Sequence, residues 1–343
     1  MILEYFSEPC EVDVIKHLLK CTIGVGTYPD DGADCHTLIR HANLAQARAL
    51  KENGINSFRF FSKDMGESVK ELLRLEARTR DALEASEFSL HYQPIIRLDT
   101  GQVAAAEALL RCSNQQLKDV PIQMLINVAE QTGLMNKLGD WIVQTATAQM
   151  QKWAHDGINL PMLSINISGK QIGNPEVTSK LADQILESGC KPSSIQLEIT
   201  ETAYMRDIEV AGNTLKNLQK IGVQIALDDF GTGHSSLSYI QKLSPDAIKI
   251  DRSFVDGINV SHANEAMVAA VIEMSTRLGL RVVAEGVESE DQIAVLQELS
   301  CSEIQGYYIS PPMPSDVFVD WLRLFQGETS PSQTAQKTKA GRA

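Results

Sequence analysis

A carboxylate, an amide or a lysine follows each of six apolar runs of this chain, at the point where the run ends. These residues are Glu107, Asn166, Glu198, the pair Asp228 and Asp229, Lys249 and Glu285. A strand of a parallel sheet that is buried on both faces reads as a continuous apolar run. We therefore expect these polar groups at the carboxyl ends of strands, where barrel enzymes place their chemistry. Because Mg²⁺ and Mn²⁺ prefer oxygen ligands, the sequence predicts a divalent-metal site that contains one lysine.

Each of these residues also has a plainer interpretation. A single carboxylate at a strand end is usually a solvated loop residue or a helix cap, and Asn166 would serve as a cap near Lys170. The adjacent Asp228 and Asp229 favour a metal site, because neighbouring like charges raise each other's free energy unless a positive charge binds beside them. Lys249 alone would also suit a Schiff-base enzyme, but acidic surroundings keep a lysine charged and oppose that chemistry.

Composition limits the classes of protein to consider. A chain of 343 residues with 43% apolar composition can bury a large core in one large and one small domain. It has neither the roughly 20 successive apolar residues of a membrane span nor a secretory signal at its start, so we expect a soluble cytoplasmic protein. Its net charge of −13 opposes binding to nucleic-acid polymers. The six cysteines form no CxxC pair, which argues against disulfide and zinc frameworks.

From Phe88 to about Leu324 the pattern alternates between strands and helices, which predicts an α/β fold, a modified TIM (β/α)8 barrel. The expected strands are 89–97, 103–111, 162–168, 194–200, 222–229, 246–250, 281–285 and 303–309. The expected helices include 137–155, 176–188, 206–220, 262–278 and 289–298. Only the short turn 98–102 separates the first two strands, so we expect an antiparallel hairpin and hence an antiparallel first strand.

The regions on either side of the barrel differ from it. Residues 1–64 contain an apolar run, a helix-periodic stretch and the aromatic segment NSFRFF, which predict a small N-terminal α/β fragment of the β-α-β type. An amphipathic stripe over 65–87 predicts a connecting helix, and the barrel is expected over 88–326. The polar tail 327–343 is expected to be disordered.

Seven segments resemble, in order, the signatures of the EAL family of cyclic di-GMP phosphodiesterases. They are EALLR at 107–111, SINIS at 164–168, EITE at 198–201, DDFGTGHSSL at 228–237, KIDRSFV at 249–255, AEGVE at 284–288 and QGYYIS at 305–310. The segment before them, 22–61, resembles the carboxyl-terminal half of a GGDEF domain. The half that would bind GTP is absent from this chain, so the resemblance implies a degenerate GGDEF remnant without cyclase activity.

The resemblance implies metal-dependent hydrolysis of cyclic di-GMP to linear pGpG, which lowers a bacterial second messenger. The implied ligands of one metal are Glu107, Asn166, Glu198 and Asp228, and those of the second are Asp228, Asp229 and Glu285. Lys249 would position the attacking water. The cofactors would be Mg²⁺ or Mn²⁺, two per site, with Ca²⁺ as an inhibitor. The implied substrate contacts are Gln93, Leu109, Arg111 and Gln305, and the implied supports of the loop 228–237 are Glu201 and Glu288.

Three positions depart from the family pattern. Cys112 stands where tryptophan is common, His234 where tyrosine is usual, and Pro311 where arginine is frequent. None of them removes a metal ligand, so we expect effects on affinity or loop dynamics. The alternative function is a non-hydrolysing cyclic di-GMP receptor, a class that usually lacks ligands. The family also suggests a homodimer through the barrel, formed by the loop and helix that follow Asp229.

Overall fold

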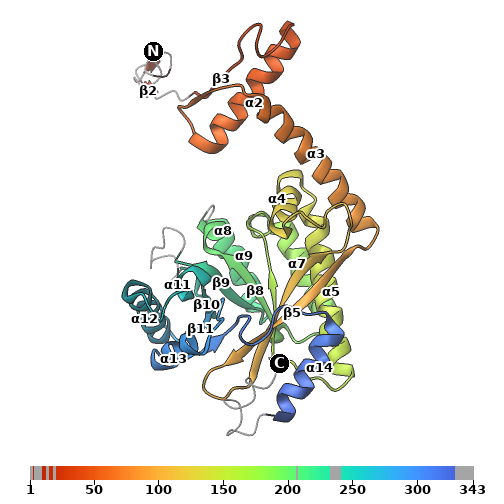
Figure 1. Cartoon of the computed structure of the whole chain (residues 1–343), viewed down its shortest axis with the longest axis vertical. Helices are drawn as coiled ribbons and strands as arrows, with labels where there is room; N and C mark the ends of the chain where they lie inside the picture. Colours follow the sequence, from red (N-terminus) through yellow and green to blue (C-terminus); the bar gives the residue numbers. More distant parts are fainter. Residues whose placement is uncertain are drawn as a thin grey trace. The chain divides into compact units, whose positions relative to one another are not determined.

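The computed structural model describes residues 21–205, 208–231 and 242–328, together with Leu3, Ile240 and the segments 10–12 and 15–17. It divides into two compact units, Met1–Thr79 and Arg80–Ala343, which we describe separately (Figure 1). His234 and most of the predicted tail lie outside the described residues. The first two residues of that tail, 327 and 328, end a helix and so depart from the prediction.

The smaller unit contains the predicted β-α-β fragment. The strands β3 (Ile23–Val25) and β4 (Phe58–Phe60) pair in parallel, and α2 (Cys35–Asn53) connects them. Asp34 begins this helix as its N-cap by accepting a hydrogen bond from the backbone N–H of Thr37. A short antiparallel pair, β1 (Cys10–Val12) with β2 (Ile15–His17), was not predicted. The predicted connecting helix is α3 (Lys63–Glu84), which ends three residues earlier than expected.

The larger unit is a closed eight-stranded barrel, as predicted. Its strands are β5 (Phe88–Arg97), β6 (Val103–Cys112), β7 (Leu163–Asn166), β8 (Ile195–Thr200), β9 (Gln224–Phe230), β10 (Ala247–Ile250), β11 (Arg281–Ala284) and β12 (Glu303–Ile304). They close in the order β10-β11-β12-β5-β6-β7-β8-β9. Strand β5 runs antiparallel to both of its neighbours, and all other pairs are parallel. The predicted antiparallel first strand is therefore confirmed.

Helices surround the barrel on its outer side (Figure 1). They are α4 (Ile122–Thr132), α5 (Met135–His155), α6 (Gly169–Ile172), α7 (Pro175–Glu187), α8 (Glu201–Met205), α9 (Ile208–Lys220), α11 (Arg252–Val255), α12 (His262–Arg277), α13 (Glu290–Glu298) and α14 (Ser315–Glu328). Sequence analysis missed α4 and α14. It also expected a strand over 303–309, but pairing stops at Ile304. The chain turns there because Gly306 packs directly against the backbone of Val287.

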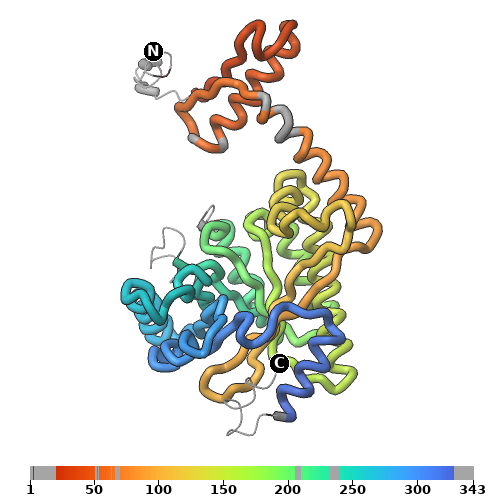
Figure 2. Tube along the Cα trace, viewed as in Figure 1, coloured from red at the N-terminus to blue at the C-terminus, as the bar shows by residue number. Residues whose placement is uncertain are grey.

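The last helix, α14, runs along the outside of the barrel (Figure 2), and aromatic side chains attach it there. Tyr92 on β5 lies 4.7 Å from the ring of Trp153 on α5, and Trp153 lies 5.1 Å from the ring of Phe318 on α14. All three side chains are buried. Among the described residues, no helix combines the length and the apolar character that crossing a bilayer requires.

Candidate active site

A buried lysine lies among four carboxylates at the carboxyl end of the barrel. Lys249 on β10 is 1% exposed. Its Nζ lies 2.6 Å from Glu198 Oε2, 2.6 Å from Glu285 Oε1, 3.2 Å from Glu107 Oε2 and 3.6 Å from Asp228 Oδ1. These carboxylates come from β6, β8, β9 and the residue directly after β11. Segments far apart in the sequence therefore converge on one ammonium group, as the strand-end pattern predicted.

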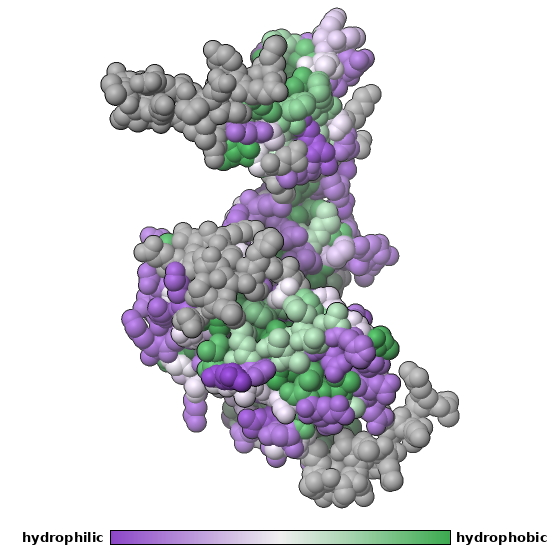
Figure 3. Space-filling model, turned by 90° about the vertical axis from the view of Figure 1, so that its left-hand side faces the viewer, coloured by the Kyte–Doolittle hydropathy of each residue, from purple (hydrophilic) through white to green (hydrophobic). Residues whose placement is uncertain are grey.

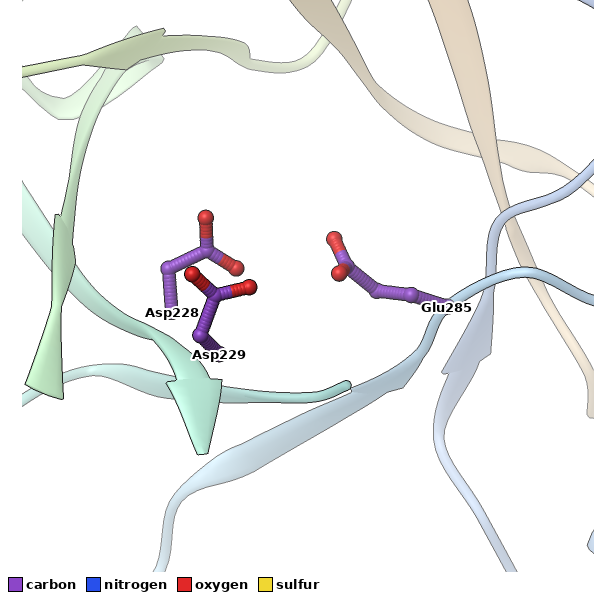
Figure 4. Close-up of side chains that lie close together, drawn as sticks. All are labelled: Asp228, Asp229 and Glu285. Carbon is purple, nitrogen blue, oxygen red and sulfur yellow. The ribbon is translucent and has the colours of Figure 1, made fainter. Parts of the chain in front are cut away.

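Two of these four carboxylates, together with Asp229, form a group that could hold a metal ion. Asp228, Asp229 and Glu285 each offer one carboxylate oxygen within 4.8 Å of the others, a spacing that would suit a cation (Figure 4). Asp228 Oδ1 is buried and accepts no hydrogen bond from the described residues. Its nearest positive group, Lys249 Nζ, lies 3.6 Å away, so this buried oxygen is only partly satisfied and the geometry fits a bound cation.

An irregularity in β9 brings the two adjacent aspartates to the same site. Strand β10 pairs with β9 at Leu227 and again at Phe230, so two residues of β9 stand opposite one residue of β10. Asp229 has a φ of +54°, in the left-handed region that residues other than glycine rarely adopt. Successive residues of a regular strand point to opposite faces, whereas a bulge redirects a side chain. The bulge therefore allows both carboxylates to face Glu285.

Asn166 also lies at this end of the barrel. It stands opposite Glu198 in the pairing of β7 with β8, and its Nδ2 donates to Glu107 Oε1 at 2.7 Å. The alternative that Asn166 caps a helix is wrong, because Ser168 caps α6 through a capping box with Gln171.

The central lysine and Glu107 stabilise each other's charged form. Burial opposes the charge on Lys249, but Asp228 and the other three carboxylates raise its pKa well above the usual value. Burial likewise opposes the charge on Glu107. Lys249 together with the N–H groups of Gln305 and Asn166 nevertheless lowers the pKa of Glu107. The raised pKa favours the ammonium form of Lys249, which is the form expected from the sequence and which opposes a Schiff-base role.

The environment of three other carboxylates at this site, Asp229, Glu285 and Glu198, disfavours their charged form. Burial and the charge of Asp228 raise the pKa of Asp229 to about 6. Burial also raises the pKa of Glu285 to about 8. Lys249 opposes this rise, and the negative charge of Asp228 adds a smaller contribution to it. For Glu198, burial and the neighbouring Glu107 raise the pKa well above its usual value. The single positive charge of Lys249 does not balance the negative charges of these carboxylates, so the site favours the binding of additional cations.

One of the expected substrate residues, Gln305, contacts the cluster directly and joins a second one, Gln93, to it. Gln305 Nε2 donates to Glu107 Oε2 at 2.7 Å and to Gln93 Oε1 at 3.1 Å, and both glutamines are buried. Leu109 and Arg111 follow Glu107 on the same face of β6, and both are partly exposed. Burial lowers the pKa of Arg111, and its Nη1 donates to the backbone oxygen of Leu110 at 2.7 Å.

The two expected loop supports lie in different surroundings. Glu201 is buried, and its Oε2 accepts a hydrogen bond from the N–H of Gly231 at 3.3 Å, where the chain leaves β9. Glu288 is exposed, and its Oε1 lies 2.8 Å from Arg252 Nη2. The following residues 232–239 lie outside the described chain, so contacts of Glu288 with the loop stay a prediction.

Sequence reasoning missed polar residues inside the barrel. Gln196, two residues before Glu198, is 1% exposed and lies 3.5 Å from that carboxylate. Strand alternation was the available signal, because residues two apart share a face and Glu198 was already expected to face the site.

Comparisons with known proteins agree with this architecture. The model of the EAL domain matches residues 76–312. The cyclic di-GMP phosphodiesterase NbdA of Pseudomonas aeruginosa is 32% identical over 330 residues, which are 96% of this chain and 42% of that protein. The chain thus spans less than half the length of this curated relative.

Two solved proteins share the fold. The PaMucR phosphodiesterase, in complex with c-di-GMP, is 34% identical with a TM-score of 0.68, and the match covers 71% of this chain and 99% of that one. BlrP1 of Klebsiella pneumoniae was solved with cyclic di-GMP and either calcium or manganese. These two structures are 29% and 28% identical with TM-scores of 0.58 and 0.59, and each match covers 66% of this chain and 56% of that one.

Proposed function

This chain belongs to the EAL domain family, and we propose that it hydrolyses cyclic di-GMP to linear pGpG with the help of divalent cations. The observation that carries the proposal is the convergence of four carboxylates from separate strands on the buried ammonium of Lys249. The NbdA and PaMucR proteins, named as a cyclic di-GMP phosphodiesterase and as a phosphodiesterase with c-di-GMP, support the choice of substrate.

We assign the metal ligands in two groups. The first group is Glu107, Asn166, Glu198 and Asp228, and the second is Asp228, Asp229 and Glu285. The proximity of Asp228, Asp229 and Glu285 supports this assignment, and so does the buried Asp228 Oδ1, which accepts no hydrogen bond from the described residues. Bound Mg²⁺ or Mn²⁺ would offset the charge of the phosphate and favour ionisation of the attacking water.

Lys249 would hold the ligands together and position the nucleophile. Its ammonium has three donors, and in this structure it approaches Glu107, Glu198 and Glu285 most closely. A fixed positive charge at this point stabilises negative charge that develops on the reacting phosphate. Its raised pKa makes it a poor general base, so its proposed role is orientation and charge stabilisation.

Four side chains around this cluster are the proposed substrate contacts. Gln93 and Gln305 are fixed by hydrogen bonds to each other and to Glu107, so they offer preoriented amides. Leu109 would offer an apolar contact to a base. Arg111 carries the planar donor fork that suits a phosphate. The proposed roles of Glu201 and Glu288 are to support the loop after β9.

The proposal is tested by incubating purified protein with cyclic di-GMP and separating the nucleotides by chromatography. We expect pGpG to accumulate with Mg²⁺ or Mn²⁺, to be absent with a chelator, and to fall sharply when Ca²⁺ replaces them. The Asp228→Asn variant is the matched control. Binding of the nucleotide without turnover in any of these metals would instead support the receptor function.

We also propose a homodimer through the barrel in a cytoplasmic protein. Most of the interface expected from the sequence, the loop and helix that follow Asp229, lies outside the described residues. A separate face, formed by α12 and the turn before it, exposes apolar side chains. Val260 is 81% exposed and Met267 is 49% exposed, and Figure 3 shows hydrophobic surface gathered on the side of the larger unit that carries α12. A second copy would cover this face. Analytical sedimentation of wild type and Met267→Glu tests the proposed dimer. We expect wild type to sediment as a dimer and the variant as a monomer.

A further inference from the structure

The amino-terminal ends of the barrel strands enclose a second buried polar cluster, which surrounds Arg281. Arg281 begins β11, and its Nη1 lies 3.2 Å from Glu303 Oε2 on β12. Its Nη2 donates to Gln196 Oε1 at 2.6 Å and to Gln224 Oε1 at 2.7 Å. One guanidinium therefore joins the side chains of three other strands at the end of the barrel opposite the carboxylate site.

The interior between the two ends contains both apolar and polar side chains. A cluster of buried apolar side chains fills part of it: Ile95, Ala105, Met162 and Val283. On β7 and β8 the corresponding side is polar, because Ser164 and Gln196 stand opposite each other in register and are 0% and 1% exposed. Burying these groups has no benefit for packing alone, since an apolar residue would fill the same space without needing hydrogen bonds.

Arg281 determines how the amide of Gln196 is oriented. A guanidinium only donates hydrogen bonds, so the oxygen of the amide must face Arg281. The NH₂ group of Gln196 then points to the other side. There it donates to Ser164 Oγ at 2.8 Å and approaches Glu198 Oε1 at 3.5 Å. Glu198 thus has a donor near each carboxylate oxygen: Gln196 Nε2 approaches Oε1 from the amino-terminal side of the barrel, and Lys249 Nζ donates to Oε2.

We propose that Gln196 is a positioning residue for Glu198, and that Arg281 fixes its donor toward that carboxylate. This inference rests on the proposed metal site. A carboxylate that is held in its binding rotamer before a cation arrives loses less conformational freedom when the cation binds. Partners that hydrogen-bond a metal ligand typically contribute about 10-fold to 100-fold to metal affinity or activity.

Gln224 offers a matched control within the same cluster. It gives Arg281 an amide oxygen at 2.7 Å, as Gln196 does, but its own Nε2 donates to the backbone oxygen of Ser193 at 3.4 Å and not to a site residue. Gln196→Met and Gln224→Met therefore remove equivalent contacts of Arg281. Only the first variant removes a donor to Glu198.

The experiment is a calorimetric titration of Mn²⁺ into wild type and both variants without nucleotide, followed by kinetics at saturating Mn²⁺. We expect the dissociation constant of Mn²⁺ to rise about 10-fold or more in Gln196→Met and less than about twofold in Gln224→Met. The KM for cyclic di-GMP should be the same in both variants, because the nucleotide contacts are untouched. Equal Mn²⁺ affinity in the two variants would overturn the inference.

Failure of the inference and failure of the proposed function give different results. If wild type binds Mn²⁺ and Gln196→Met binds it equally well, only the inference is wrong. If wild type binds no Mn²⁺ at all, the proposed metal site is wrong and the inference falls with it. If Gln196→Met does not fold, Gln196→Asn serves instead, because it keeps an amide but is one methylene shorter. Its loss of Mn²⁺ affinity supports the inference, and wild-type affinity contradicts it.

Discussion

At the amino-terminal end of the barrel, the buried carboxylate of Glu303 faces the guanidinium of Arg281, and two amide oxygens complete the cluster. At the carboxyl-terminal end, four carboxylates approach the single ammonium of Lys249. The first cluster is balanced in charge and the second is not. A buried pair of opposite charges needs no further ion, whereas an excess of one sign has to be compensated by something that binds. The difference points to the acidic end as the place of chemistry.

The largest expected effect is the loss of catalysis in Asp228→Asn. Asp228 belongs to both proposed ligand groups, and removing its charge withdraws several kcal/mol of interaction with the cations. We expect kcat/KM to fall by at least about 1,000-fold, since 1.36 kcal/mol corresponds to tenfold in rate. Without metal, the variant should melt at a higher temperature than wild type, because it relieves repulsion among the carboxylates. If the variant lost both stability and activity, the carboxyl-terminal end would not carry the excess of negative charge that distinguishes it from the amino-terminal end.

Lys249→Met tests the cation at the centre of the acidic end. Removing one partner of a buried ionic cluster typically costs about 3–5 kcal/mol, and four carboxylates lose their shared partner here. We expect a marked fall in the free energy of unfolding, measured in urea with a chelator, and a nearly complete loss of turnover. Added Mn²⁺ should restore part of the stability and none of the turnover. Restored turnover would show that the lysine only holds the ligands together.

Glu303→Gln tests the balanced end of the barrel. The variant keeps the shape of the side chain but removes the charge that faces Arg281. Burial raises the pKa of Glu303 in spite of this contact, so the ion pair offsets only part of the cost of burying the charge. The free energy of unfolding should therefore change by less than the strength of a charge-assisted contact, about 1.5–3 kcal/mol, and kcat/KM should remain within about twofold of wild type. A large loss of activity at full stability would mean that both ends of the barrel serve the chemistry.

The smallest expected effect is a pH dependence of the metal-free protein. Folding raises the pKa of Asp229 to about 6 and of Glu285 to about 8, so the folded state binds more protons than the unfolded state. Their contribution to stability is present at low pH and is lost as the pH rises through about 6 to about 8. The melting temperature in chelator should therefore decline from pH 6 to pH 8.5. Asp228→Asn should flatten this decline, because Asp228 raises both pKa values; an unchanged slope would count against that cause.

Apolar runs and their polar ends were enough to predict the barrel, its antiparallel first strand and the gathering of Glu107, Glu198, Asp228, Lys249 and Glu285. These features depend on local periodicity, which a single sequence carries. Other features depend on contacts between distant segments. The strand expected over 303–309 stops early because Gly306 meets the backbone of Val287.

The polar residues inside the barrel show the same limit. Gln196 stands within an apolar run and not at its end, so the strand-end criterion passed over it. Its importance depends on Arg281, which lies 85 residues further along the chain. The bulge at Asp229 is likewise set by pairing with β10 and carries no glycine that would have indicated it.

The most direct test of the central claim is a crystal structure of the chain with Mn²⁺ and cyclic di-GMP, with anomalous scattering used to locate the metal. The account predicts two Mn²⁺ peaks, one among Glu107, Asn166, Glu198 and Asp228 and the other among Asp228, Asp229 and Glu285, with the nucleotide phosphate beside them. Manganese bound elsewhere, or a nucleotide bound at this end of the barrel with no metal peak at these side chains, would contradict it.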